Sequence, residues 1–239
     1  MISLLKILQA QGLGSRKVCL SMIDDGEVFV AGEVCTNAKT LAHPDDVTFL
    51  YEDELCSCTE TIFIAMNKPL GYECSAKPTH HPSVLDLIPA HFRVRGVQPI
   101  GRLDVDTSGL LLLTDDGQLI HRLTHPKRHV HKHYLITTAD EVSAIQLEKL
   151  RQPLLLNDDP HPVQAVSVTQ LGTHQLEMVI DEGRYHQIRR MLGAVGNRVE
   201  TLHRQQFGDL ILPVSLEIGA WESVSLDQIV GAEEVQRGR

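Results

Sequence analysis

The sequence has no long apolar run. No window holds the roughly eighteen consecutive uncharged apolar residues that a membrane-spanning helix needs. The opening residues, Met1 to Lys6, also lack the longer apolar core and small-residue cleavage site of a secretory signal. We therefore expect a protein that is neither exported nor embedded in a membrane and, by default, a cytoplasmic one.

Cysteine is scarce and cannot be fully paired. The chain has five cysteines, an odd number that, without an export signal, argues against a disulfide framework. Cys56 and Cys58 stand close together, yet structural zinc sites usually use two pairs with longer spacing, and no second pair exists. Also absent are GxGxxG after a strand, GxxxxGK before Ser or Thr, and HExxH. We expect free thiols, no metal and no cofactor.

Positive charge is limited in total but concentrated in places. The net charge is −9, whereas affinity for nucleic acid normally comes from Lys and Arg. Between His121 and His133, however, four Lys or Arg and five His occur without an acidic residue, and between Arg184 and Arg204 five Arg accompany one Glu. Residues 1–55 carry four basic and nine acidic residues. With 239 residues, enough for one large and one small domain, this distribution suggests RNA bound along one face of the larger domain.

A charged turn, Gly101 to Gly109, leads into the four leucines Leu110 to Leu113. The leucine run predicts a buried strand or core segment, which would hold the side chains before it in a rigid position. Asp104 is therefore a candidate for chemistry. For an isolated Gly-x-x-Asp, a turn cap would be the better interpretation, and two further motifs change that balance.

Three motifs, in the same order and at similar spacing, resemble those of the RsuA-type pseudouridine synthases. They bracket most of residues 60 to 230. The resemblance implies an enzyme that isomerises a uridine of ribosomal RNA to pseudouridine without a cofactor, on an α+β fold with a mixed, largely antiparallel sheet. The motifs are Met66-Asn67-Lys68-Pro69-Leu70-Gly71-Tyr72, Gly101-Arg102-Leu103-Asp104 with Thr107-Ser108-Gly109-Leu110, and Glu182-Gly183-Arg184-Tyr185-His186-Gln187-Ile188-Arg189-Arg190-Met191-Leu192.

The resemblance also implies roles for single residues. Asp104 would be the catalytic carboxylate, and Tyr134 would stack on the uracil and relay a proton. Either Arg189 or Arg184 would pair with Asp104 and favour its charged form, and the sequence does not choose between them. Arg102 would enter the space left by the target base, because a uridine within structured RNA must be flipped out before its glycosidic bond can be reached.

Other basic residues are candidates for RNA contact, and Lys68 fits a structural role or a phosphate contact equally well. The histidines at 129, 131 and 133 alternate as metal ligands on a strand would. No Cys or carboxylate stands near them in the sequence, and they lie among Lys and Arg, which favours contact with phosphate. The predicted RNA-binding residues are Arg102, Lys68, Arg16, Lys17, Arg128, Lys132, Arg190 and Arg198.

Residues 1–55 are similar to an S4 domain, a small RNA-binding module. Two short helices, the second opened by Ser15 as N-cap, precede a hairpin with strands at 28–30 and 33–35. In such a module Arg16 and Lys17 would meet phosphate; the alternative is a solvated helix start. The Arg and Asp usual near its beginning are replaced by Ser3 and Leu4. Residues 60–232 would form the catalytic domain.

The motif details divide between two substrates. The segments 182–187 and 202–204 resemble the small-subunit (16S) enzymes, whereas 12–16 and 219–221 lean toward large-subunit (23S) relatives of the RluB, RluE and RluF type. We predict a monomeric 16S rRNA pseudouridine synthase acting on ribosomal RNA or a pre-ribosomal particle. The alternatives are a 23S enzyme and an RNA-binding assembly factor without activity.

Overall fold

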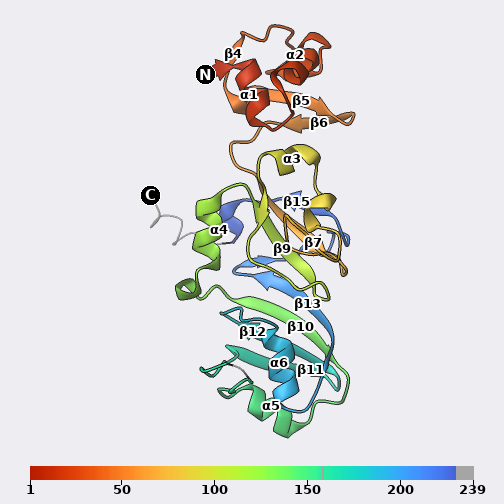
Figure 1. The fold of residues 1–239 in the computed structure, drawn as a ribbon, viewed down its shortest axis with the longest axis vertical. Coiled ribbons are helices and arrows are strands. Elements are labelled where there is room, and N and C mark those ends of the chain that lie inside the picture. The colour runs from red at the N-terminus through yellow and green to blue at the C-terminus, as the bar shows by residue number, and fades with distance from the viewer. Residues whose placement is uncertain (158, 230–239) are drawn as a thin grey trace. The chain divides into compact units, whose positions relative to one another are not determined.

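The computed structural model describes residues 1–157 and 159–229, which form two units (Figure 1). The first contains Met1–Ile62, Ile88–Gln98 and Thr114–Asp116, and the second contains Phe63–Leu87, Pro99–Leu113 and the described residues from Gly117 onward. Residues 230–232, which the sequence analysis assigns to the catalytic domain, lie outside the described part. No helix among the described residues is long and apolar enough to cross a membrane.

The first unit combines the helices α1, α2 and α3 with a small antiparallel sheet. Ser15 caps the second helix as expected, because its side chain accepts a hydrogen bond from the Val18 amide. The four-stranded sheet has the order β3-β2-β5-β6, and β1 pairs with β4. The elements are β1 (Ile2–Ser3), α1 (Leu4–Ala10), α2 (Arg16–Asp24), β2 (Val28–Val30), β3 (Glu33–Val34), β4 (Leu41–Ala42), β5 (Val47–Tyr51), β6 (Glu54–Ser57) and α3 (Ala90–Val94).

One side chain explains why segments far along the chain belong to the first unit. Arg95, just after α3, forms an ion pair with Asp115 at 2.6 Å and donates hydrogen bonds to the carbonyls of Thr59 and Glu60 at 2.8 and 2.7 Å. It also donates to Gln11 at 2.9 Å. Residues separated by more than eighty positions therefore meet at one guanidinium. The order of residues along the chain does not reveal this contact.

The second unit is built on one large mixed sheet with the order β11-β12-β10-β13-β9-β7-β15. β13 pairs with β9 in parallel and with β10 antiparallel. The expected α+β fold with a mixed, largely antiparallel sheet is thereby confirmed. The bounds are β7 (Phe63–Lys68), β8 (Gln98–Pro99), β9 (Ser108–Thr114), α4 (Gly117–Thr124), β10 (Lys132–Thr138), α5 (Ala144–Leu150), β11 (Ser167–Gly172), β12 (Gln175–Ile180), α6 (Gln187–Ala194), β13 (Val199–Phe207), β14 (Leu210–Ile211) and β15 (Trp221–Ser223).

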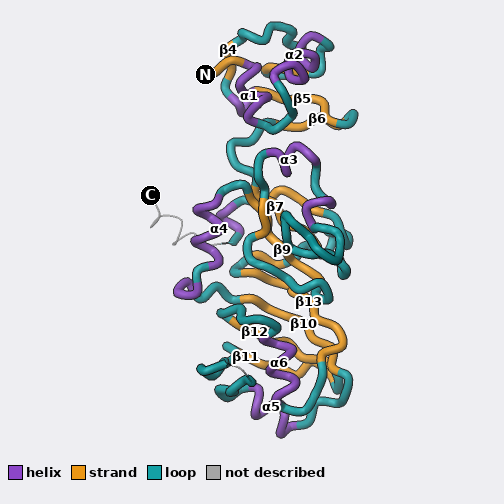
Figure 2. Tube along the Cα trace, viewed as in Figure 1, coloured by secondary structure: helices purple, strands orange, loops and turns teal. Residues whose placement is uncertain are grey.

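The leucine run forms the buried strand that the sequence predicts. Leu110 to Leu113 lie in β9 and are fully buried, and burying a leucine side chain contributes about 1.5–3 kcal/mol. The chain between β7 and β9 is mostly loop and turn, interrupted by α3, β8 and a 3-10 turn at Val84–Leu87 (Figure 2). The loop that carries Asp104 is thus attached directly to one of the most deeply buried strands.

Candidate active site

Lys68 anchors the loop that carries Asp104. Its side chain is fully buried at the end of β7, and its ammonium donates hydrogen bonds to the carbonyls of Pro69, Asp104 and Thr107 at 3.0, 3.1 and 2.9 Å. Burial lowers the pKa of Lys68, and the nearby Asp104 partly opposes that effect. Of the two roles open to Lys68 in the sequence, the structure supports the structural one, because a buried ammonium cannot meet a phosphate.

Gly109 brings β9 unusually close to β13. It has a φ of +102°, and a Cβ atom there would lie 2.8 Å from the backbone nitrogen of Arg204 and closer still to the Arg204 carbonyl oxygen. Such distances leave no room for a side chain, so the position requires glycine. The parallel register of Ser108 with His203 and of Gly109 with Arg204 depends on this approach.

Arg204, in the segment 202–204, is a buried cation whose role the sequence does not indicate. It is 2% exposed, its Nε donates to the Leu110 carbonyl at 2.7 Å, and its guanidinium lies 5.3 Å from the centre of the Phe207 ring. Among the described residues its second terminal nitrogen has no hydrogen-bond partner. Arg204 pairs in register with Tyr134 of the cavity, which connects it to the site. This strand pairing cannot be read from one sequence.

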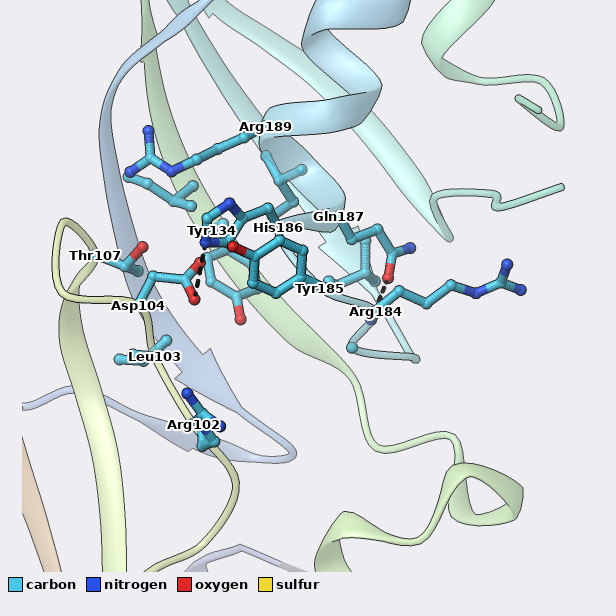
Figure 3. A pocket seen from close by; sticks show the side chains of 14 residues that line it. Arg102, Leu103, Asp104, Thr107, Tyr134, Arg184, Tyr185, His186, Gln187 and Arg189 are labelled. Atoms are coloured by element: carbon cyan, nitrogen blue, oxygen red, sulfur yellow. Dashed lines mark hydrogen bonds and ion pairs between the residues drawn. The ribbon is translucent and has the colours of Figure 1, made fainter. Parts of the chain in front are cut away.

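The second and third motifs meet around a cavity of about 270 Å³, and Lys68 of the first motif supports the cavity wall through its hydrogen bonds to the Asp104 loop. Figure 3 shows the Asp104 carboxylate next to the His186 ring on the wall of this cavity, with Tyr134 and Tyr185 beside them. The loop before β9, strands β10, β12 and β13, and the turn that opens α6 all contribute to the wall. The lining residues are Arg102, Leu103, Asp104, Thr107, Tyr134, Ile180, Gly183, Arg184, Tyr185, His186, Gln187, Ile188, Arg189 and Leu202.

The imidazole of His186 lies against the Asp104 carboxylate. Its Nε2 lies 3.5 Å from Asp104 Oδ1. His186 is the N-cap of α6, with a left-handed backbone (φ 48°) and no side-chain cap hydrogen bond. Its ring stacks on Tyr185 with centroids 3.9 Å apart and an angle of 15°. His186 stands in the third motif, but the sequence does not reveal its approach to Asp104, because that approach depends on this backbone conformation.

The turn before α6 is held by hydrogen bonds within its own motif. The Gln187 side chain is buried and accepts a hydrogen bond from the Arg184 amide at 3.0 Å. Its amide nitrogen donates to Glu182 at 3.0 Å. These contacts link the first and last residues of the turn, so the backbone that presents Tyr185 and His186 to the cavity is defined by the motif sequence.

The two arginines considered as partners for Asp104 have other partners. Arg189 lies 3.0 Å from the Asp106 carboxylate and donates to the Asp106 carbonyl at 2.9 Å. Arg184 contacts Asp159 at 2.6 Å and Glu182 at 3.1 Å, and its hydrogen bond holds the pKa of Asp159 below its usual range. In Figure 3 the Arg184 side chain points away from Asp104. Arg189 therefore fixes the Asp104 loop through its neighbour, whereas Arg184 stabilises a different loop.

Tyr134 lies at the cavity, and Lys132 is half-buried among protein groups. Tyr134 lines the cavity and is 7% exposed. The Lys132 ammonium donates to the Val130 carbonyl at 2.7 Å and lies 5.8 Å from the centre of the Phe207 ring. Burial, reinforced by the nearby Arg204 charge, lowers the pKa of Lys132 to about 8. Lys132 is thus half-buried, and its ammonium is directed to protein groups.

The remaining predicted RNA-binding residues divide by exposure. Arg102, at the cavity, and Arg128, in a 3-10 turn, are exposed. Arg198 is exposed and lies 3.1 Å from Glu200. Arg190 is half-buried, donates to the Asn157 carbonyl and lies 4.0 Å from Asp159, and its contact with RNA stays a prediction. Arg16 and Lys17 are exposed at the start of α2 in the first unit.

The alternating histidines have acidic neighbours that the sequence does not reveal. His129 lies 2.7 Å from Asp181, and His133 lies 3.5 Å from Glu177. The carboxylates come from β12 and the residue after it, because β12 pairs with β10 and places His133 beside Val179. The expectation that no carboxylate stands nearby was correct along the chain and wrong in space. Within the described residues, no group of three or more potential ligands could hold a metal ion.

Comparison with known proteins gives a consistent result. Residues 62–194 match the model of the family described as RNA pseudouridylate synthase. The chain is 35% identical over 223 residues to the ribosomal small subunit pseudouridine synthase A of Haemophilus influenzae, covering 92% of this chain and 95% of that one. The Escherichia coli K12 enzyme of the same name is 34% identical with the same coverage. A crystal structure of a pseudouridylate synthase, 33% identical, matches with a TM-score of 0.67 over 96% of this chain and 98% of that one.

Proposed function

Because the chain belongs to the RNA pseudouridylate synthase family, we propose that it converts one specific uridine of 16S ribosomal RNA to pseudouridine, with Asp104 as the catalytic carboxylate. The Haemophilus influenzae and Escherichia coli relatives, each matched over 95% of its length, are named for the small ribosomal subunit. The observation that supports the residue assignment is the position of Asp104 on the wall of the cavity where the second and third motifs meet.

The size of the cavity supports a flipped base as the reacting group. A cavity of about 270 Å³ has room for a single nucleobase. A uridine must then leave its stack before its glycosidic bond reaches Asp104. Tyr134, buried in the wall, offers an aromatic surface to the uracil. Arg102, exposed at the rim, is placed to enter the space that the base leaves.

The reaction fits a site with one carboxylate. The bond between ribose C1′ and uracil N1 breaks, the uracil turns, and a bond between C1′ and C5 forms. The proton lost from C5 is balanced by the proton gained at N1, so nothing is consumed. Asp104 acts at the ribose as nucleophile or base, and Tyr134 relays the proton. Lys68 and Arg189 hold the loop, through the carbonyls of Asp104 and Thr107 and through Asp106.

RNA binding extends beyond the cavity in this proposal. The exposed Arg102, Arg128 and Arg198 would contact phosphate, as would Arg16 and Lys17 of an S4-like N-terminal domain. Support comes from the exposure of all five side chains and from the helix order and N-cap of the first unit. We further propose a cytoplasmic monomer that needs no cofactor. Light scattering with size-exclusion chromatography tests the oligomeric state.

The decisive experiment is pseudouridine mapping on ribosomal RNA from cells that lack this gene. We expect one 16S site to disappear and to return with the wild type but not with Asp104→Asn. Asp106→Asn is the matched control, since Asp106 lies in the same loop, is 62% exposed at its side chain and does not line the cavity. It should restore the site at least in part.

Other results would redirect the proposal. A site missing from 23S RNA would keep the chemistry and change the substrate. No missing site in any RNA would favour an RNA-binding assembly factor without activity. A wild-type yield of product from Asp104→Asn would refute the role given to this carboxylate.

A further inference from the structure

Tyr185 differs from all other large aromatic residues of the protein. The chain has five phenylalanines, one tryptophan and four tyrosines, all within the described residues. Nine of the ten are buried or half-buried, whereas Tyr185 is 76% exposed. A single exposed apolar residue needs no explanation by itself. The position of this one, on the wall of the cavity that holds Asp104, calls for one.

The Tyr185 ring is oriented rather than free. It stacks on His186 with centroids 3.9 Å apart and planes 15° from parallel, so one ring face is covered. The large exposed fraction then leaves the opposite face open to solvent. The Tyr185 carbonyl accepts a hydrogen bond from Arg190 at 3.4 Å. His186 holds its ring there with a left-handed backbone, φ 48°, a conformation that non-glycine residues keep mainly where the surroundings fix it, often at functional sites.

The two tyrosines of the cavity lie at different depths. Tyr134 is almost fully buried and Tyr185 is the exposed one, and both line the cavity with Asp104 (Figure 3). The inner position suits the reacting uracil. The outer position is where the chain of an RNA would continue from a nucleotide inserted into the cavity.

We propose that the open face of Tyr185 is a stacking subsite for the nucleobase next to the target uridine. This inference rests on the proposed function, because it assumes a flipped uridine. Flipping removes a stacking partner from each neighbouring base, and an exposed aromatic ring at the rim replaces one of them. Stacking of this kind tolerates any base, because every base has an aromatic face. The subsite therefore adds affinity for single-stranded RNA rather than selecting a sequence.

The test measures coupling between Tyr185 and the flanking base. RNA fragments containing the mapped uridine are made with an intact, a 5′-abasic or a 3′-abasic neighbour. Their affinities are measured on the Asp104→Asn background, so that no product forms. We expect Tyr185→Ala to weaken binding of intact RNA about tenfold, or about 1.4 kcal/mol, within the range for base stacking. Tyr185→Phe should bind as tightly as tyrosine, and Tyr185→Leu should bind like alanine.

The abasic RNAs distinguish base stacking on Tyr185 from a structural role in which Tyr185 only supports the His186 ring. On one of the two sides, removing the base should weaken binding to Tyr185 about tenfold and leave binding to Tyr185→Ala nearly unchanged. Equal losses from Tyr185→Ala with intact RNA and with both abasic RNAs would refute the subsite and leave a structural role. Leu171→Ala, an exposed apolar residue on β11, is the control and should have no effect. The binding assay does not require catalysis, whereas a failure of the proposed function would show in the mapping experiment, where no site would be missing from the RNA of cells that lack this gene.

Discussion

Replacement of Gly109 by alanine tests the close approach of β9 to β13 on which the site is built. The new Cβ would lie 2.8 and 2.9 Å from the nitrogen and carbonyl carbon of Arg204. These are backbone atoms of a strand paired on both sides, so neither strand can yield by rotating a side chain. The substitution must separate the strands or distort the loop that ends at Gly109.

The expected loss in the free energy of unfolding is the sum of two terms. An alanine at positive φ costs about 1–2 kcal/mol, and forcing an extra methyl group into a packed interior costs roughly 1–3 kcal/mol more. We therefore expect Gly109→Ala to lower the free energy of unfolding by about 2–5 kcal/mol, a large part of the roughly 5–15 kcal/mol of a typical domain. The activity should fall as well, because the Asp104 loop is attached to the displaced strand.

Gly219→Ala is the matched control. Gly219 also has a positive φ, 85°, but no atom lies within 4 Å of its Cβ position, so only the first term applies. Urea unfolding followed by fluorescence of Trp221, the single tryptophan, reports on the second unit, where β15 pairs with β7. This choice matters because a protein with two units need not unfold in one step. Equal stabilities of Gly109→Ala and Gly219→Ala would refute the close approach.

Two further predictions concern Lys68, which is buried, and Lys132, which is half-buried. Lys68→Met should reduce kcat at least tenfold with little change in KM and cost about 1–3 kcal/mol of stability, because three carbonyls lose their donor; an unchanged kcat would exclude Lys68 as the anchor of the Asp104 loop. For Lys132, burial lowers the pKa from 10.5 to about 8. Between these two pH values the lysine is protonated in the unfolded chain but not in the folded protein. The free energy of unfolding therefore rises with pH over this range, by on the order of 3 kcal/mol. Denaturant unfolding from pH 8 to 10.5 should show this rise in the wild type and a smaller one in Lys132→Met; parallel curves would contradict the lowered pKa.

The sequence alone predicted the parts of the protein that depend on local pattern. Four adjacent leucines predicted a buried strand, and Ser15 predicted a helix start; both are confirmed. The three motifs identified the family and singled out Asp104, because each motif is a short segment with its own turn and strand. These features are determined by residues that are neighbours along the chain.

Tertiary structure decided which charges meet. Arg184 and Arg189 are five residues apart and equivalent in the sequence, yet one reaches Asp159 and the other Asp106. The contact of His186 with Asp104 depends on a left-handed backbone at one residue. The burial of Arg204 beside Gly109 depends on the parallel register of two strands almost a hundred residues apart. Electrostatic contacts act over a few ångströms in space, and only the folded chain fixes which side chains come within that range.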